Sequence, residues 1–215
     1  MTTLEWVRKS KIIAIVQGLS PEYMIKLAEA LYAGGIDLME VTFNQARPES
    51  WSDTAEAIHT VAKRMEGRML VGAGTVIRQN QLDMARNAGA KYIITPNTSQ
   101  TLIRKVKEYG LASFPGAFTP SEIVEAYEAG ADMVKVFPAG NVGASYIKAI
   151  KAPLNQIPLM AVGGVNEKNA AEFMAAGCCG LGVGGNLVNK TWIEAGEWDK
   201  ITALAAEYRK AVGRE

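Results

Sequence analysis

Histidine and cysteine, the usual ligands of protein-bound zinc, are nearly absent from this chain. His59 is the only histidine, and the two cysteines are the neighbours Cys178 and Cys179. We therefore predict no metal site. Adjacent residues of a strand point to opposite faces, so we expect the cysteines to be small core residues with no disulfide between them. His59 lies in a helical pattern and is expected at or near the surface, which disfavours histidine general-base chemistry.

An excess of one charge and a long apolar run are missing as well. The chain has 23 Lys and Arg against 22 Asp and Glu, and no basic run or Arg-aromatic cluster indicates a nucleic-acid partner. No apolar run approaches the roughly 20 residues that span a bilayer, and the segment Met1 to Trp6 has no apolar signal core. We expect a soluble, cytoplasmic protein with neither a nucleic-acid nor a membrane partner.

Eight short runs rich in apolar and β-branched residues recur along the chain. They are Lys11 to Gln17, Ile36 to Phe43, Met69 to Gly72, Lys91 to Thr95, Leu111 to Phe114, Asp132 to Phe137, Pro158 to Val162 and Cys179 to Val183. Their starts lie roughly 20 to 33 residues apart, which is the period of a strand plus a helix. Uninterrupted alternation of this kind predicts parallel strands covered by helices.

We therefore predict an α/β fold, a single (β/α)8 TIM barrel over residues 1–215. An extra N-terminal helix is expected over Thr2 to Ser10, before the first strand, and a last helix over Glu197 to Val212. The chain is near the short end of the usual barrel length, so its loops must be tight. An open, doubly wound sheet is the alternative.

The segments between the runs carry helix start and stop signals. Ser20 and Thr119 each precede a proline, with a carboxylate one or two residues further on, which is typical of an N-cap. An Ala-Gly pair follows a helical segment four times, just before the next strand, with its glycine at Gly34, Gly89, Gly130 or Gly177. Glycine commonly ends helices, so we predict four short loops that lead from a helix into a strand.

Two charged residues interrupt apolar strands near the end where TIM barrels place their active sites. Period-two counting puts Glu40 on the face of Leu38, and Lys135 on the face of Met133 and Phe137, so both charges are expected to point into the barrel. Burial lowers the pKa of a lysine and makes it a nucleophile for carbonyl groups, and a nearby carboxylate can move the required protons. The alternative is a buried ion pair that merely neutralises itself.

Glycine pairs follow the last two predicted strands. Gly163 and Gly164 come after the seventh, and Gly184 and Gly185 after the eighth. Loops at these two positions, with exposed backbone N–H groups, are the usual phosphate cradle of a TIM barrel. A plain tight turn would explain either pair alone, but both together predict a phosphate site.

Further candidate substrate contacts stand after the first four strands. Gln17, Asn44, Thr75 and Pro96 each follow one of them. Each of these residues is also ordinary in a turn or a helix cap, so the position alone leaves its role open.

Together these residues resemble those of the 2-keto-3-deoxy-6-phosphogluconate (KDPG) and 4-hydroxy-2-oxoglutarate (KHG) aldolases, class I pyruvate aldolases with a TIM-barrel fold. The similarity covers essentially the whole chain. It is carried by six segments in order: residues 34–42, 71–76, 114–122, 134–139, 162–165 and 182–185.

This resemblance implies roles for the candidate residues. Lys135 would form the Schiff base and Glu40 would shuttle protons, while Thr75, Pro96 and Phe137 would line the pyruvate pocket. The glycine pairs would hold the phosphate. The resemblance also implies a metal-independent enzyme without a cofactor, a small 2-keto acid as substrate, and a homotrimer.

The sequence departs from the family pattern at four positions. Many members carry arginine where this chain has Gln17 and Asn44, and serine or threonine where it has Val162 and Gly185. An amide replaces a guanidinium only partly as a partner for a carboxylate or phosphate. Arg47 and Arg78, on adjacent loops, are the candidates to supply the missing charge.

The leading functional hypothesis is retro-aldol cleavage of a 2-keto acid. KDPG would give pyruvate and glyceraldehyde 3-phosphate, and 4-hydroxy-2-oxoglutarate would give pyruvate and glyoxylate. One alternative is a phosphate-binding isomerase or epimerase, in which Glu40 abstracts a proton and Lys135 stabilises charge. Another is a barrel that binds a keto acid without turnover and reports it to a partner.

Overall fold

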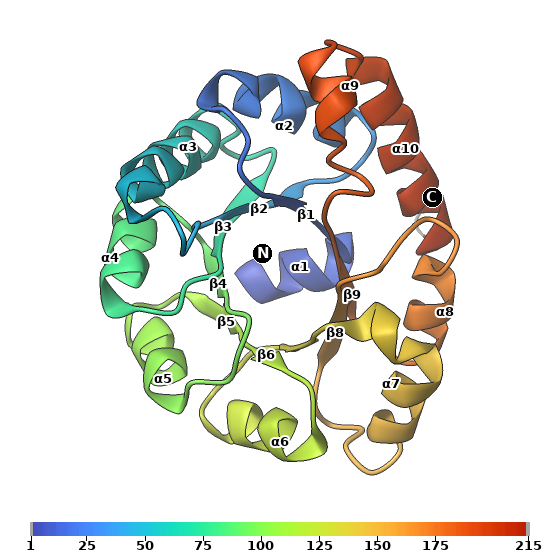
Figure 1. Cartoon of the computed structure of the whole chain (residues 1–215). Helices are drawn as coiled ribbons and strands as arrows, with labels where there is room; N and C mark the ends of the chain where they lie inside the picture. The colour runs from blue at the N-terminus through green and yellow to red at the C-terminus, as the bar shows by residue number, and fades with distance from the viewer. Residues whose placement is uncertain (1, 214–215) are drawn as a thin grey trace.

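The structure is a computed structural model that describes residues 2–213. The predicted domain over 1–215 extends beyond these residues at both ends. Within them, nine parallel strands form a nearly closed ring surrounded by helices (Figure 1). The strands are β1 (Ile12–Val16), β2 (Leu38–Thr42), β3 (Leu70–Gly74), β4 (Tyr92–Ile94), β5 (Ala112–Phe114), β6 (Gly116–Ala117), β7 (Val134–Val136), β8 (Leu159–Val162) and β9 (Gly180–Val183).

Ten α-helices and three short 3₁₀ helices precede, connect or follow these strands in the described chain. The α-helices are α1 (Thr3–Ser10), α2 (Met24–Ala33), α3 (Trp51–Arg64), α4 (Gln79–Asn87), α5 (Gln100–Glu108), α6 (Pro120–Glu128), α7 (Gly143–Lys151), α8 (Ala170–Ala175), α9 (Lys190–Glu194) and α10 (Trp198–Ala211). The 3₁₀ helices are η1 (Pro21–Tyr23), η2 (Pro48–Ser50) and η3 (Ala139–Asn141). Between residues 2 and 213, no helix is long and apolar enough to cross a membrane.

The ring is interrupted only where the chain passes from β5 to β6. The strand order is β5-β4-β3-β2-β1-β9-β8-β7-β6, so the two edge strands are neighbours in sequence, with Pro115 between them. Proline has no backbone N–H to donate to a ladder. The sequence predicted one strand at Leu111 to Phe114, and the structure has two short ones because Pro115 breaks the pairing. The described chain therefore has nine strands where the sequence predicted eight.

The two faces of the sheet pack into separate clusters. Met39 and Val41 of β2 lie in the core between the sheet and the helices. Leu38 lies in the cluster inside the ring, together with Tyr92 and Met133. The period-two assignment of these strands is therefore confirmed, and the residues of the same phase, Glu40 and Lys135, face the interior.

Helix α1 lies across one end of the ring (Figure 1). Its Val7 is fully buried in the interior cluster, and Trp6 Nε1 donates to Asp37 Oδ2 at 2.9 Å. Asp37 directly precedes β2, so α1 covers the amino ends of the strands. The carboxyl ends remain open for a site.

The predicted helix boundaries are largely confirmed. In each of the four Ala-Gly loops, the N–H of the residue after the glycine donates back to the helix, as in Ala90 N–H to the Ala85 carbonyl at 3.0 Å. Thr119 caps α6 in a reciprocal bond with Glu122. The side-chain cap expected at Ser20 is absent, because its hydroxyl donates to Glu22 at 3.1 Å.

Candidate active site

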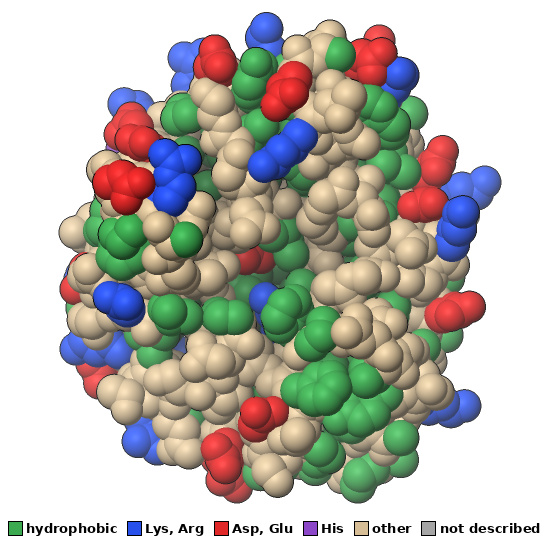
Figure 2. Space-filling view, in the orientation of Figure 1, with side chains coloured by type: hydrophobic (Ala, Val, Ile, Leu, Met, Phe, Trp, Pro, Cys, Tyr) green, Lys and Arg blue, Asp and Glu red, His purple; other side chains and the backbone are tan. Residues whose placement is uncertain are grey.

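A cavity of about 600 Å³ opens at the carboxyl ends of the strands. Figure 2 shows this face hollowed at its centre, with basic and acidic side chains visible inside the hollow. The predicted catalytic pair, both glycine pairs and the predicted substrate contacts other than Asn44 line this cavity. They are Gln17, Glu40, Thr75, Pro96, Lys135, Phe137, Gly163, Gly164, Gly184 and Gly185.

Lys135 reaches the cavity because β7 alternates its side chains. Val134 and Val136 pack into the core between the sheet and the helices, which turns Lys135 inward. The backbone N–H of Lys135 donates to the Pro115 carbonyl at 2.8 Å. The residue is only 7% exposed, and its Nζ lies 4.7 Å from the centre of the Phe137 ring.

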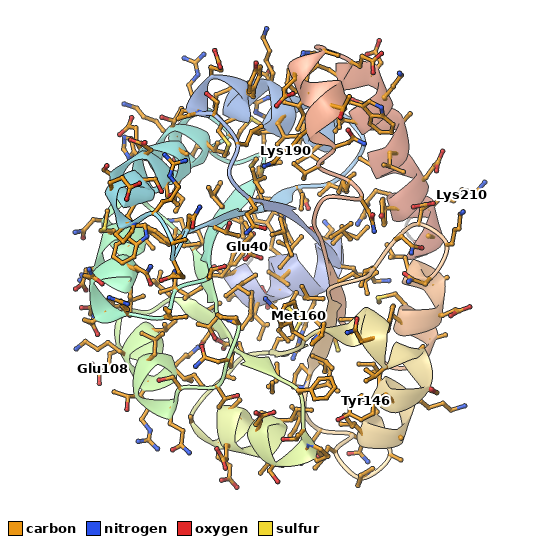
Figure 3. All side chains as sticks on the ribbon, in the orientation of Figure 1. Glu40, Glu108, Tyr146, Met160, Lys190 and Lys210 are labelled. Carbon is orange, nitrogen blue, oxygen red and sulfur yellow. The ribbon has the colours of Figure 1, made fainter. Side chains whose placement is uncertain are left out.

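Glu40 projects from β2 into the middle of the ring (Figure 3). It is 1% exposed. The space it occupies exists because β3 has glycine at position 74, where an added Cβ would lie 1.7 Å from Glu40 Oε1. Its other oxygen, Oε2, has no hydrogen-bond partner among the described residues. A buried carboxyl oxygen without a protein partner is free to meet a reactant.

Burial moves both groups towards their neutral forms. It raises the pKa of Glu40 from 4.5 to about 7, although the charge of Lys135 acts in the opposite direction. It lowers the pKa of Lys135 from its ordinary 10.5, with Glu40 opposing. No salt bridge joins the two within residues 2–213, so the self-neutralising ion pair is not the arrangement observed. Groups tuned in this way can exchange protons with a molecule that lies between them.

Thr75 and Pro96 line the same cavity from the loops after β3 and β4. Thr75 has a φ of +55°, which is unusual for a β-branched residue. Pro96 lies against β6, where a Cβ added to Gly116 would be 2.5 Å from the Pro96 carbonyl carbon. Glycine at 116 therefore allows the loop after β4 to approach closely.

The two glycine pairs form one wall. Gly163 and Gly164 have φ values of +86° and +75°, and a Cβ on Gly164 would lie 2.9 Å from the Cα of Gly140. Glycine is therefore required at positions 163 and 164, both by the positive φ values and by the close neighbouring atoms. At Gly184 and Gly185 an added Cβ would meet nothing within 4 Å. The second pair leaves open space at the cavity wall.

A second cavity of about 470 Å³ adjoins the first. Gln17 and the second glycine pair line both cavities, while Asn44 lines only the adjoining one. Asn44 Oδ1 accepts a bond from the Ala46 N–H at 2.9 Å, so this oxygen is engaged in a turn.

Lys190 supplies the charge in the adjoining cavity. It is the one charged side chain among the described residues that line it, and Figure 3 shows it near the rim of the barrel opening. Its Nζ donates to the Gly18 carbonyl at 3.2 Å. Lys190 could not be identified from the sequence, because nothing there distinguishes it from an ordinary surface lysine.

The two arginines suggested as replacements lie elsewhere. Arg47 Nε pairs with Glu49 Oε1 at 3.3 Å on the surface. The Arg78 guanidinium lies 5.9 Å from the centre of the Trp51 ring. Neither is among the described residues that line the cavity of Lys135.

Six further residues of that cavity lacked a functional assignment from sequence: Ile15, Thr42, Val162, Val165, Gly182 and Asn186. Thr42 shares the inward phase of Glu40, so the strand period already contained its signal. Asn186 Nδ2 donates to the Val165 carbonyl at 3.0 Å and joins the loops after β9 and β8. No local sequence pattern predicts such a contact between loops.

His59 and the cysteines lie outside the site. His59 is exposed on α3, and the cysteines are unpaired. Cys178 packs on the helix side of the sheet and Cys179 against the interior cluster, which confirms their predicted opposite orientation. Over residues 2–213, no group of three His, Cys, Asp or Glu could hold a metal ion.

Comparisons with known proteins converge on one family. The family model "KDPG and KHG aldolase" matches residues 4–204. The chain is 34% identical over 210 residues to the 2-dehydro-3-deoxy-6-phosphogalactonate aldolase of Escherichia coli K12, covering 97% of this chain and 100% of that one. It is 33% identical over 198 residues to the KHG/KDPG aldolase of the same organism, covering 91% and 89%.

Solved structures agree. The fold superposes with a TM-score of 0.85 on a KDPG aldolase from Legionella pneumophila, in which pyruvate was captured as a covalent carbinolamine intermediate. The two chains are 29% identical, and the superposition covers 95% of this chain and 97% of that one.

Proposed function

This chain belongs to the KDPG and KHG aldolase family, and from that premise we propose that it cleaves a 2-keto acid to pyruvate and an aldehyde through a Schiff base on Lys135. The observation that carries the proposal is the pair of buried groups, Lys135 and Glu40, which face one cavity without pairing with each other. Chemistry that needs both a nucleophilic amine and a proton carrier requires such an arrangement.

Lys135 performs the covalent step. Its neutral amine attacks the C2 carbonyl carbon of the substrate and forms a carbinolamine, which loses water to give an iminium ion. The lowered pKa of Lys135 favours the neutral amine, and burial holds it ready without a competing carboxylate partner. The iminium ion then accepts the electron pair of the breaking bond, so the reaction needs no metal or cofactor.

Glu40 moves the protons. As a carboxylate it accepts the proton of the C4 hydroxyl while the C3–C4 bond breaks, which releases the aldehyde and leaves an enamine on Lys135. Protonation of the enamine at C3 and hydrolysis then release pyruvate and restore the free amine. A carboxyl whose pKa is about 7 can give and take protons near neutral pH.

The other end of the substrate faces the glycine pairs and Lys190. Gly184 and Gly185 line both cavities, so a chain that starts at Lys135 can continue past them into the space that Lys190 lines. Lys190 then supplies the cation that Gln17 does not. We therefore propose a phosphorylated 2-keto-3-deoxy acid as the preferred substrate, with KDPG first and 4-hydroxy-2-oxoglutarate as a second substrate of the same chemistry.

The related E. coli enzyme that acts on 2-dehydro-3-deoxy-6-phosphogalactonate makes this compound the third candidate. It differs from KDPG only in the configuration at C4, so it has the same phosphate end and the same products. Lys190 would bind the phosphate group of either compound equally well.

We also propose that β5 and β6 count as one interrupted strand, which makes the fold a (β/α)8 barrel preceded by α1. The single break at Pro115 supports this count.

The family resemblance supports a homotrimer.

Pyruvate release from the three substrates, measured with a coupled dehydrogenase, tests the proposed reaction and the phosphate end together. Wild-type enzyme is expected to turn over a phosphorylated substrate, and Lys135→Met is expected to release no pyruvate. Lys190→Met is expected to raise KM for KDPG about tenfold, the effect of losing one charge-assisted hydrogen bond. Its KM for 4-hydroxy-2-oxoglutarate is expected to stay unchanged.

Lys168, an exposed lysine outside both cavities, gives the matched control Lys168→Met, which should keep both KM values. Equal KM changes for both substrates in Lys190→Met would contradict the role of Lys190. Full activity of Lys135→Met would contradict the reaction itself.

A further inference from the structure

Thr75 holds a conformation that its own chemistry disfavours. Apart from Lys11, it is the only non-glycine residue with a positive φ in the described chain, at +55°. A β-branched residue in this region is strained, and such strain persists only where the surroundings hold it. Thr75 lines the cavity that contains Lys135 and Glu40. The strained residue is therefore also a wall of the site.

A chain of two amides holds this residue in place. Gln45, on the loop after β2, donates from Nε2 to the Thr75 carbonyl at 2.7 Å. Gln81, on α4, donates from its own Nε2 to Gln45 Oε1 at 3.0 Å. Gln81 Oε1 accepts the Ile77 N–H at 2.9 Å. Gln81 thus fixes the loop after β3 at two points, directly at Ile77 and through Gln45 at Thr75.

The burial of Gln81 shows that these bonds matter to the fold. Its side chain is fully buried, whereas Gln79 and Asn80 beside it in the first turn of α4 are exposed. A buried amide costs free energy unless its oxygen and nitrogen are both bonded. Here both atoms are bonded, and both bonds lead to the loop that carries Thr75. A residue that served only packing would be apolar at this position.

Thr75 itself keeps its donors free. Neither its backbone N–H nor its hydroxyl donates to another residue in the part of the chain that the structure describes. No arginine lines the cavity among those residues. The carboxylate of a 2-keto acid bound at Lys135 would therefore depend on neutral donors such as these.

We propose that Gln45 and Gln81 are positioning residues that hold Thr75 in its left-handed conformation, so that its donors bind the carboxylate of the 2-keto acid. The proposal rests on the proposed function for its ligand, but the coupling between the amides and Thr75 is a property of the fold alone. Gln45 and Gln81 act through Thr75 and touch no reacting atom.

The affinity for pyruvate tests the part of the proposal that concerns substrate binding by Thr75. Gln45→Met and Gln81→Met keep side-chain length and remove the amide bonds, and Gln79→Met is the matched control on the exposed face of the same helix. The pyruvate concentration that half-saturates borohydride inactivation is expected to rise about tenfold in the first two variants. The rate of inactivation at saturating pyruvate should stay within about twofold of wild type, since Lys135 and Glu40 are untouched. An unchanged half-saturation value in folded Gln45→Met would overturn the proposal.

A thermodynamic cycle tests the coupling without any activity. Glycine adopts φ +55° freely, so in a Thr75→Gly background the amide chain has no strained residue to hold. Urea unfolding is expected to show a lower midpoint for Gln45→Met in the wild-type background and a clearly smaller decrease in the Thr75→Gly background. Equal decreases in both backgrounds would overturn the proposal. Gln45 is half-exposed, so its variants stay usable even if Gln81→Met does not fold.

If wild-type protein is not inactivated by borohydride and pyruvate, the proposed function fails while the cycle still reports on the coupling. The two failures are thus distinguishable.

Discussion

Lys135 and Glu40 lie close enough for each to affect the pKa of the other, yet no salt bridge joins them among the described residues. Desolvating two charges without a direct bond between them costs free energy. Part of that cost is avoided because burial favours the neutral form of each group. A site that tolerates this cost has its reactive groups in place before the substrate arrives.

Glu40→Gln tests the proton-transfer role. The amide keeps the shape but cannot accept a proton, so kcat for KDPG cleavage is expected to fall about 100-fold or more. In the wild type, kcat should rise as pH increases through about 7, because the basic form of Glu40 is the carboxylate and its pKa is about 7. The variant should lose this rise. Steady-state rates between pH 5.5 and 8.5 measure both effects, and a variant with an unchanged pH profile would contradict the role.

The stability of Glu40→Gln should also depend on pH in a different way from that of the wild type. The pKa of Glu40 is raised from 4.5 to about 7 in the folded state, so between these values the folded protein binds more protons than the unfolded one. The stabilising contribution of protonated Glu40 is therefore complete below about pH 4.5 and is lost as pH rises through 7. Glu40→Gln should thus gain stability relative to wild type as pH increases over this window, which urea unfolding at pH 5 and pH 8 can show.

At the scale of single elements, β3 shapes the barrel interior through its glycines. Gly72 gives room to the fully buried ring of Tyr92, and Gly74 gives room to the Glu40 side chain. Both glycines lie on the inward phase of the strand, where an ordinary side chain would fill the space that Glu40 and Tyr92 occupy. β3 therefore contributes to the site because its glycines leave room for the side chains of Glu40 and Tyr92.

Two alanine variants of β3 should separate stability from activity. A Cβ at position 72 would lie 2.0 Å from the Tyr92 ring, which is enclosed, whereas one at position 74 would meet the more flexible end of Glu40. Gly72→Ala is expected to reduce the free energy of unfolding by about 1–3 kcal/mol or more. Gly74→Ala is expected to reduce kcat more than tenfold, because Glu40 must turn away from its position. Denaturant unfolding and steady-state rates measure the two effects, and full activity of Gly74→Ala would show that the position of Glu40 is not critical.

The strands illustrate what sequence alone could predict. The inward phase of Lys135 and Glu40 follows from side-chain alternation, which is local and needs no knowledge of the partner strands. The glycine stops were equally predictable because they depend on one residue's conformation. The break at Pro115 was missed, since the run before it reads as an ordinary strand and only the ring geometry shows which neighbours it pairs with.

Lys190, Gln81 and Gln45 escaped prediction because their roles depend on contacts between segments that are distant in sequence. Lys190 reaches the cavity from α9, and Gln81 reaches Thr75 through Gln45. Lysine and glutamine are common on surfaces, and their position in sequence does not reveal where their long side chains end. Only the folded arrangement brings α9, α4 and the loop after β2 to the same opening.

For the whole molecule, an apolar patch over α6 and α7 bears on assembly. Figure 2 shows apolar side chains gathered beside the central hollow, where Figure 3 labels Tyr146. The Phe118 and Tyr146 rings stack with their centres 5.8 Å apart. Val124, Ala149 and Leu154 continue the patch as a groove. We propose that other copies of this chain cover it in a homotrimer.

Sedimentation equilibrium tests this assembly. The expected mass is about three times that of one chain, as burial of an exposed apolar surface would favour. Ala149 is exposed within the groove, so Ala149→Glu should dissociate the trimer without disturbing the fold. The control Ser145→Glu, on the same helix outside the groove, should remain trimeric. A wild-type protein with the mass of a single chain would contradict the assembly.

Borohydride reduction in the presence of pyruvate tests the central claim most directly. Wild-type protein treated with both reagents should lose activity and carry one reduced pyruvate per chain, which peptide mass spectrometry should locate on Lys135. Lys135→Met should acquire none, while Lys190→Met should be labelled at Lys135 like the wild type. Absence of the adduct, or its attachment to a lysine other than Lys135, would contradict the Schiff-base mechanism.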